Sequence, residues 1–580
     1  MRTLEAGGNA FDAATAGALT MQVVGPHLNG PAGDVSILIY SADERRVRSI
    51  CGQGPTPAAA TIETFEAHGL DLVPGTGLMA AVVPGAFDAW MLLLRDYGTC
   101  SLEDVIAPAI EYAQGGFPVL SRMRATLDSA RPIFERYWPT SADIYLPGGK
   151  VPVEGALFAN PRLAATWRRL VAETSGQTSK GRESRIDAAR KVWSRGFIAQ
   201  AIDSFCRHTR AMDISGQENG ALLCGEDLAK WSAFYEEPTT YDYKGHRVAK
   251  CGPWSQGPVL LQSLAILSGT DVACVSPEGA DFVHLLVEAM KLAYADRDTY
   301  YGDPDHADVP LDQLLSPSYN ELRRDLIEPI ASHDWRPGAT GMAVPEVDFA
   351  GATARKREGG ALAAYGGGEP TFASIERGNY LAATVGDTAH IDVVDRFGNM
   401  VSATPSGGWL QSSPCVSELG FPLGTRAQMM WLTSKTSPSA MGPGRRPRTT
   451  LSPTIVLRDD GEAYLACGTP GGDQQDQWQL AFLLRCLDYN MGMQEAIEAP
   501  AFHSEHWPSS FYPRQASPGA LTVEGRFAPE TIRDLEARGH KVTVGGDWSE
   551  GRLSAVARGV DKTVRAAASP RGMDGYAVGR

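Results

Sequence analysis

Apolar residues recur mainly with helical spacing over the first two-thirds of the chain. The alanine-rich stretch at 10–19 places its apolar side chains on one face and predicts a helix. Helical patterns then dominate from 86 to 330, for example in ADFVHLLVEAMKLAYADRDTYYG, which a following GDP terminates. Two short apolar runs, at 36–40 and 47–51, break this pattern and predict strands.

The pattern changes after residue 337. Residues 337–387 are rich in glycine, alanine and charge and lack sustained periodicity, so this segment is a candidate mobile loop. A hairpin is predicted next, with strands His390–Val394 and Met400–Ala403. Residues 452–467 predict a second hairpin around Arg458-Asp459-Asp460-Gly461, and 474–498 predict a helix. Helices followed by a strand-rich third indicate a layered α/β protein.

Composition narrows the partners. Of 580 residues, 43% are hydrophobic and 21% charged, and the formal net charge is -15, so we expect no nucleic-acid partner and no membrane partner. No apolar run reaches the ~20 residues of a membrane helix. Nine cysteines without CxxC spacing suggest neither a disulfide framework nor a zinc site, and no cofactor is expected. The first residues do not form a signal peptide, which favours the cytoplasm.

Candidate chemistry centres on Thr388, at the junction of the loop and the first predicted strand. A threonine hydroxyl is a poor nucleophile unless a base lies beside it. Backbone cleavage before the threonine frees its own α-amino group, which places a base on the same residue. The alternative is that Thr388 is there only because threonine favours strands.

Blocks in order along nearly the whole chain carry a family resemblance. They include GGNAFDAATAGA, VVPGAFDAW, VEAMKLAYADRDTYYGDPD, GDTAHIDVVDRFGNMVSAT, GPGRRPRTTLSPTIVL and CGTPGGDQQ. With these blocks the chain resembles the γ-glutamyltransferase family of N-terminal-nucleophile hydrolases. The CGTPGGDQQ and RRPRTTL blocks look more like the amidohydrolase branch of that family, which includes oxamate amidohydrolases and dicarboxylyl-cephalosporin acylases.

The resemblance implies a four-layer αββα sandwich. It also implies self-cleavage between Asp387 and Thr388, which gives a large chain, 1–387, and a small chain, 388–580, that together form one structural unit. A homodimer of processed units is a further candidate assembly. Only six residues precede Gly7, fewer than in the family, so we expect a truncated chain or a misplaced start. An upstream signal peptide lost in this way would place the protein in the periplasm or outside the cell.

Site residues follow from the same blocks. The resemblance makes Thr388 the nucleophile, Gly471 and Gly472 the oxyanion hole, and Thr404 or Ser406 the hydrogen-bond partner of Thr388. Glycines suit an oxyanion hole because no side chain blocks the tetrahedral oxygen; the alternative is a simple tight turn. Thr449 and Thr450 stand where a family hydroxyl pair contacts the substrate carboxylate.

Departures from the family concern the substrate. Gln53 stands where the family has an arginine that grips the glutamyl α-carboxylate, and an amide cannot form that charged bidentate pair. Gly408 replaces an expected asparagine, and no carboxylate lies at Gln428-Met429 to neutralise an α-ammonium group. We expect Arg426 to be an anion contact in a more apolar pocket, for which Trp409, Trp431 and Met429–Met430 are candidate lining residues; the alternative for the two tryptophans is that they are core residues.

Three functions therefore compete. The first is a self-processing γ-glutamyl hydrolase or transferase, which cleaves an amide by acyl transfer to Thr388 and on to water or an amine. The second is an amidase for another acyl group. The third is an uncut, non-catalytic homologue that acts as a binding protein.

Overall fold

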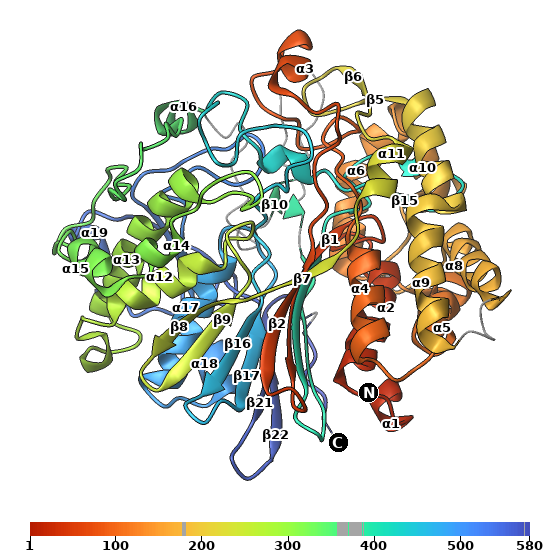
Figure 1. Cartoon of the computed structure of the whole chain (residues 1–580). Helices are drawn as coiled ribbons and strands as arrows, with labels where there is room; N and C mark the ends of the chain where they lie inside the picture. Colours follow the sequence, from red (N-terminus) through yellow and green to blue (C-terminus); the bar gives the residue numbers. More distant parts are fainter. Residues whose placement is uncertain (177–180, 356–368, 371–384, 387, 574, 580) are drawn as a thin grey trace.

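Two β-sheets lie against each other in the centre of the computed structural model, which describes residues 1–176, 181–355, 369–370, 385–386, 388–573 and 575–579 (Figure 1). The first sheet is antiparallel and has five strands. In spatial order these are β12 (Ile391–Val394), β13 (Met400–Ser406), β1 (Asp34–Ser41), β2 (Arg46–Gly52) and β7 (Phe234–Glu236).

The second sheet has six antiparallel strands. In spatial order these are β22 (Val564–Ala568), β21 (Ser554–Arg558), β17 (Ala463–Gly468), β16 (Thr454–Arg458), β9 (His246–Lys250) and β8 (Thr239–Tyr243). A small core joins the two sheets, with Leu38 and Tyr40 of the first against Ile455 and Ala466 of the second. These side chains are buried because strand side chains alternate between faces and these positions point toward the other sheet.

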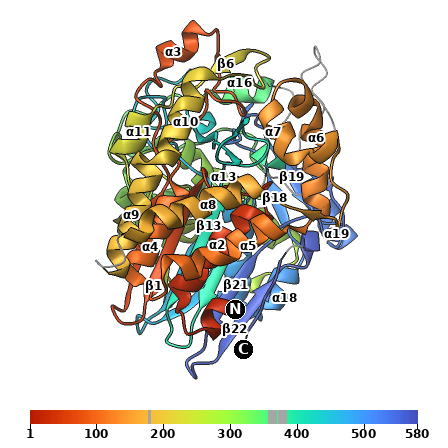
Figure 2. The same cartoon turned by 90° about the vertical axis from the view of Figure 1, so that its right-hand side faces the viewer.

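Helices cover the outer face of each sheet (Figures 1 and 2). On the first sheet, α2 (Ala10–Val24) packs on β12 and β13, and α4 (Ala86–Tyr97) packs on β1 and β2. Behind them lie α5 (Leu102–Gly115), α8 (Pro161–Thr174) and α9 (Arg182–Arg195), with α6 (Ser121–Arg136), α7 (Pro139–Tyr145), α10 (Phe197–His208) and α11 (Gly225–Lys230) at the periphery.

On the second sheet, α12 (Pro258–Leu267) packs on β8 and β9, α17 (Gln475–Leu487) on β17 and α18 (Met493–Glu498) on β22. The long helix α13 (Ala280–Tyr300) lies behind α12 and α17 and is buried along nearly all its length. The remaining helices here are α14 (Leu311–Leu314), α15 (Pro317–Arg324) and α19 (Pro529–Ala537).

Shorter elements complete the described chain. Three are helices, α1 (Arg2–Glu5), α3 (Ile62–Ala67) and α16 (Phe349–Ala354), and 3-10 turns lie at Pro147–Gly149, Val272–Cys274, Arg426–Met429 and Arg571–Met573. The small sheets pair β3 (Phe117–Pro118) with β4 (Leu157–Phe158), β5 (Arg210–Met212) with β6 (Glu218–Gly220), β10 (Glu369–Pro370) with β11 (Val385–Gly386), β14 (Cys415–Val416) with β15 (Phe421–Pro422), and β19 (Ala520–Val523) with both β18 (Phe502–Ser504) and β20 (Lys541–Val544).

The α/β class predicted from the sequence is confirmed, as are the two hairpins and the strands near 36–40 and 47–51. The single helix predicted for 474–498 is wrong. It breaks between α17 and α18, where Asn490 has a φ of 55° and Gly492 begins the second helix. A left-handed residue cannot continue an α-helix, which explains the break.

The segment 239–250 also differs from the helical region in which the sequence places it. It forms the β8–β9 hairpin, which turns at Lys244-Gly245, both with positive φ. Of the predicted loop 337–387, the described part includes α16, capped by the Asp348 side chain; residues 356–368, 371–384 and 387 lie outside the described residues. Within the described ranges, no helix is long and apolar enough to cross a membrane.

Asp395 holds the β12–β13 hairpin to the first helix layer. Its carboxylate accepts from the backbone N–H groups of Phe397, Gly398 and Asn399 in the turn, and from the N–H of Ala10 at the start of α2, all at 2.9–3.0 Å. These donors are the orphan N–H groups of a turn and a helix end, which need an acceptor when they are buried.

We therefore expect Asp395→Ala to lower the free energy of unfolding by roughly 1.5–3 kcal/mol, because two buried and two partly buried N–H donors lose their acceptor at once. Chemical denaturation monitored by tryptophan fluorescence measures this. Asp459→Ala, in the exposed turn of the other hairpin, is the control and should unfold like the unchanged protein. Equal stability of the two variants would contradict the role of Asp395.

Candidate active site

Thr388 is fully buried directly before β12. The N–H of the next residue, Ala389, donates to the carbonyl of Pro405 at 3.0 Å, which extends the β12–β13 ladder back to the threonine. The Oγ1 of Thr388 lies 3.2 Å from Oγ of Ser406 on β13. The structure thus brings the predicted pair Thr388 and Ser406 together, whereas Asp387 lies outside the described residues.

Thr404 serves a different neighbour. Its Oγ1 lies 2.8 Å from Nδ1 of His390, and Nε2 of His390 lies 2.9 Å from Oδ1 of Asp392. Ser554 of β21 donates to Oδ2 of the Asp392 carboxylate at 2.9 Å. This series of hydrogen bonds therefore links the first sheet to the second. His390 and Asp392 were not predicted as site residues, although the alternation Thr-Ala-His-Ile-Asp indicates one polar strand face.

Gly471 and Gly472 form the turn between β17 and α17. Gly471 has a φ of 112°, a backbone conformation that strongly favours glycine. The Gly472 carbonyl accepts from Nε2 of Gln256 and from the N–H of Gln475, both at 3.2 Å. Pro470, directly before the turn, lines the same cavity of about 320 Å³ as Thr388, so turn and threonine adjoin one space.

A buried ion pair lies beside Ser406. Asp34 of β1 stands opposite Ser406 in the strand register, and its carboxylate receives Nη2 of Arg426 at 2.9 Å and Oγ1 of Thr449 at 3.4 Å. Burial raises the pKa of Asp34, and the charge of Arg426 opposes that rise. Gly33 is required here, because a Cβ at that position would lie 2.1 Å from the carbonyl oxygen of Ser406.

Arg426 also contacts two aromatic rings. Its guanidinium carbon lies 5.5 Å from the ring centre of Trp409 and 5.8 Å from that of Phe511, and both rings pack with Met429 in one small apolar cluster. Trp431, predicted to share this pocket, instead stacks against Arg514 at 3.9 Å. The predicted anion contact is therefore already engaged by a carboxylate and by aromatic faces.

The other predicted substrate contacts have local surroundings. Gln53 is fully buried, and its Nε2 donates to the carbonyl of the adjacent Gly54 at 2.9 Å. Its Oε1 has no hydrogen-bond partner among the described residues. Thr449 anchors its own backbone by donating to the carbonyl of Trp254 at 2.8 Å, and Thr450 is fully buried next to it.

One group of potential metal ligands joins α13, which carries His284 and Glu288, to the loop between α19 and β20, which carries His540. His284, Glu288 and His540 are buried within ligand distance of one another. The carboxylate of Glu288 already pairs with two positively charged side chains, Lys291 at 2.6 Å and Arg336 at 3.0 Å. His284 and His540 share a hydrogen bond of 2.9 Å. We therefore interpret the cluster as a hydrogen-bonded one in which a cation would meet two positive neighbours.

Comparisons with known proteins agree with this architecture. The family model of γ-glutamyltranspeptidase matches residues 1–579. The glutathione hydrolase-like YwrD proenzyme of Bacillus subtilis is 31% identical across 100% of this chain and 95% of its own length. The solved structure of LmbA2991HD is 52% identical, with a TM-score of 0.90 over 100% of this chain and 96% of that one. Cephalosporin acylase from Bacillus halodurans is 26% identical, with a TM-score of 0.80 over 100% and 92%.

Fold and relatives define the class of protein first: a self-processing amidohydrolase or acylase with a mixed α/β fold. More specifically, the chain belongs to the γ-glutamyltranspeptidase family.

The Asp34–Arg426 pair makes a prediction about stability. Arg426→Gln leaves Asp34 buried without its counter-charge, and Asp34→Asn does the same to Arg426, so we expect each change to cost about 3–5 kcal/mol of unfolding free energy. The double variant removes both charges and should cost less than either single change. Chemical denaturation of the three variants gives the coupling energy.

The exposed pair Glu66–Lys435, at 3.4 Å, is the matched control. Lys435→Gln should change the unfolding free energy by about 1 kcal/mol or less, because solvent screens an exposed pair. Additive losses in the Asp34–Arg426 cycle would show that the two side chains do not stabilise each other.

Proposed function

We propose that the protein cleaves its own backbone between Asp387 and Thr388 and then uses Thr388 as the nucleophile of an amide hydrolase. The observation that carries this proposal is the position of Thr388, buried at the start of a central strand with a hydroxyl group, Ser406, 3.2 Å from its own. The two facing sheets with outer helices support assignment to the four-layer αββα sandwich of N-terminal-nucleophile hydrolases.

Self-cleavage begins with attack of the Thr388 hydroxyl oxygen on the Asp387 carbonyl carbon. The peptide C–N bond breaks, an ester forms, and the Thr388 nitrogen takes the proton to become a free α-amine. Water then hydrolyses the ester and leaves chains 1–387 and 388–580, which stay together because β13, in the second chain, pairs with β1 in the first.

Catalysis on substrate repeats this chemistry. The Thr388 hydroxyl attacks the amide carbonyl, the α-amine takes its proton, and Gly471 and Gly472 donate their N–H groups to the oxyanion. The protonated amine then gives the proton to the leaving nitrogen, and water or an acceptor amine releases the acyl group from the threonine ester. Ser406 holds the hydroxyl of Thr388, and His390 holds the hydroxyl of Thr404 on the same strand.

We propose that the substrate's acyl group is not an intact γ-glutamyl group. Gln53 replaces the carboxylate-gripping arginine, and Asp34 already occupies one side of Arg426, so a second carboxylate there would meet a negative neighbour. Asp34, Thr449 and Thr450 remain candidate contacts for a smaller or uncharged acyl group. Because the chain belongs to this family, a γ-glutamyl amide is the alternative substrate. The non-enzymatic alternative is that the chain stays uncut and acts as a binding protein.

We also propose that the processed unit acts on a small-molecule amide without nucleic acid, membrane or cofactor, either alone or as a homodimer. The net charge of -15 supports the absence of polyanionic partners. Nine free cysteines, all within the described parts of the chain, support a reducing, cytoplasmic setting.

Replacement of the nucleophile tests the proposal. Thr388→Ala should leave one full-length band on a denaturing gel after prolonged incubation and should abolish amide hydrolysis, because the attacking oxygen is gone. Thr433→Ala, at an exposed threonine, should still give two bands and full activity. Two bands or residual turnover in Thr388→Ala would refute the assignment, and one band in the unchanged protein would favour the binding protein.

A set of three anilides tests the acyl group. γ-Glutamyl, glutaryl and butyryl p-nitroanilide share a four-carbon chain that includes the carbonyl. Its last carbon carries an ammonium group and a carboxylate in the first, a carboxylate in the second and only hydrogens in the third. Without the arginine pair, we expect kcat/KM for the γ-glutamyl anilide to be at least about 10-fold below that of the best of the other two. A γ-glutamyl anilide turned over fastest would restore the glutamyl assignment.

A further inference from the structure

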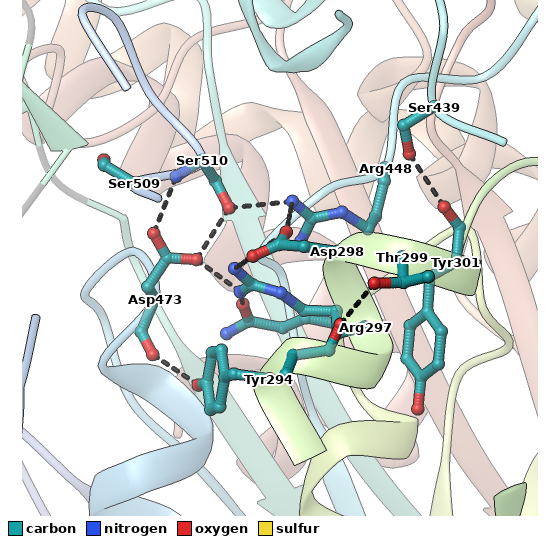
Figure 3. A network of polar contacts seen from close by, with 12 residues as sticks. Tyr294, Arg297, Asp298, Thr299, Tyr301, Ser439, Arg448, Asp473, Ser509 and Ser510 are labelled. Atoms are coloured by element: carbon teal, nitrogen blue, oxygen red, sulfur yellow. Dashed lines mark hydrogen bonds and ion pairs between the residues drawn. The ribbon is translucent and has the colours of Figure 1, made fainter. Parts of the chain in front are cut away.

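A buried polar network surrounds the residue that follows the glycine turn (Figure 3). Asp473 accepts from Ser510 twice, with Oδ2 2.8 Å from the Ser510 backbone nitrogen and Oδ1 2.6 Å from the Ser510 hydroxyl oxygen. Arg297 of α13 donates to the same Oδ1. The Tyr294 hydroxyl, one turn earlier on α13, donates to the Asp473 backbone carbonyl. Side chain and main chain of Asp473 are thus both fixed.

Arg297 reaches the turn by a second route. Its Nη1 also donates to Oε1 of Gln256 at 2.9 Å, and Nε2 of Gln256 donates to the carbonyl of Gly472 at 3.2 Å. The guanidinium of Arg297 therefore holds the Gly472–Asp473 peptide at two points. It acts on the Gly472 carbonyl through Gln256, and it binds the Asp473 side chain directly. Two successive glycines would otherwise leave this turn with wide conformational freedom.

The charges around the turn are balanced by pairs. Asp298, next to Arg297 on α13, accepts from Arg297 at 3.1 Å and from Arg448 at 3.0 Å. Burial by itself raises the pKa of Asp473, but the charges of Arg297 and Arg448 and the hydrogen bonds from Ser510 outweigh it and lower that pKa. Asp473 is consequently ionised at neutral pH, and its hydrogen bonds are charge-assisted.

From this geometry we infer that Asp473, held by Arg297 and Ser510, is a positioning residue that orients the Gly471–Gly472 N–H groups toward the oxyanion. The inference rests on the proposed function, which assigns those N–H groups to the oxyanion hole. Donors stabilise an oxyanion only when they already point at it before the reaction, so a turn made of glycines needs an external clamp. Asp473 touches no reacting atom and acts through the turn.

Asp473→Asn tests the inference with Asp298→Asn as its matched control. Both aspartates are buried and both pair with Arg297, but Asp298 lies on α13 and makes no contact of its own to the turn among the described hydrogen bonds. We expect Asp473→Asn to lower kcat on the best of the three anilides by about 10- to 100-fold, with KM within about 3-fold. Asp298→Asn should keep kcat within about 3-fold.

Hydrogen exchange gives a readout that is independent of activity. The backbone amides of residues 468–477 should exchange faster in Asp473→Asn than in the unchanged protein, and at an unchanged rate in Asp298→Asn. Ser510→Ala keeps the Ser510 N–H donor and removes only the hydroxyl, so it should show the same kcat loss in milder form, about 3- to 10-fold. This variant carries the test if Asp473→Asn does not fold.

Unchanged kcat in Asp473→Asn, or equal kcat losses in the two asparagine variants, would overturn the positioning role, as would a change confined to KM. Failure of the proposed function gives a different result, since either Thr388→Ala would keep its activity or the unchanged protein would stay uncut and inactive. The exchange rates report on the turn in either case.

Discussion

The hydrogen-bond ladder of strand β13 is the constraint on which the site depends. β13 pairs with β12 on one side and with β1 on the other, and all seven of its residues are buried. The first pairing carries Thr388 to Ser406, and the second places Asp34 opposite that same serine. A slip of the register by one residue would turn the polar face of β13 toward the apolar helix layer, so the register is fixed. One ladder therefore positions Thr388, Ser406 and Asp34 together.

The sequence predicts the parts of this arrangement that are local. Period-two alternation and the Asp395–Asn399 turn predict the hairpin that carries Thr388, and the ordered blocks of family resemblance predict the glycine turn. The β8–β9 hairpin was missed, because its strand alternation is short and lies among strongly helical segments. The break between α17 and α18 was missed because a left-handed asparagine is a feature of the backbone that helical periodicity does not reveal.

The residues that surround the nucleophile are a harder case. Asp34 and Arg426 are 392 positions apart, and Arg297 and Asp473 are 176 apart, so no pattern within one segment links them. Arg426 was predicted to bind an anion of the substrate, and only the fold shows that an aspartate of the first sheet already pairs with it. Departures from the family at Gln53 and Gly408 indicated an altered head-group site without indicating what fills it.

Charge burial links the two halves of the site. Two of the buried arginines near it have a carboxylate partner within the site, Asp34 for Arg426 and Asp473 for Arg297. Such pairs contribute little net stability compared with apolar residues of equal volume, because desolvation opposes the attraction. What they supply is geometry, since a bridging carboxylate fixes every donor that points at it. A site that must hold a hydroxyl and a glycine turn in place before any substrate arrives gains more from that rigidity than from further apolar packing.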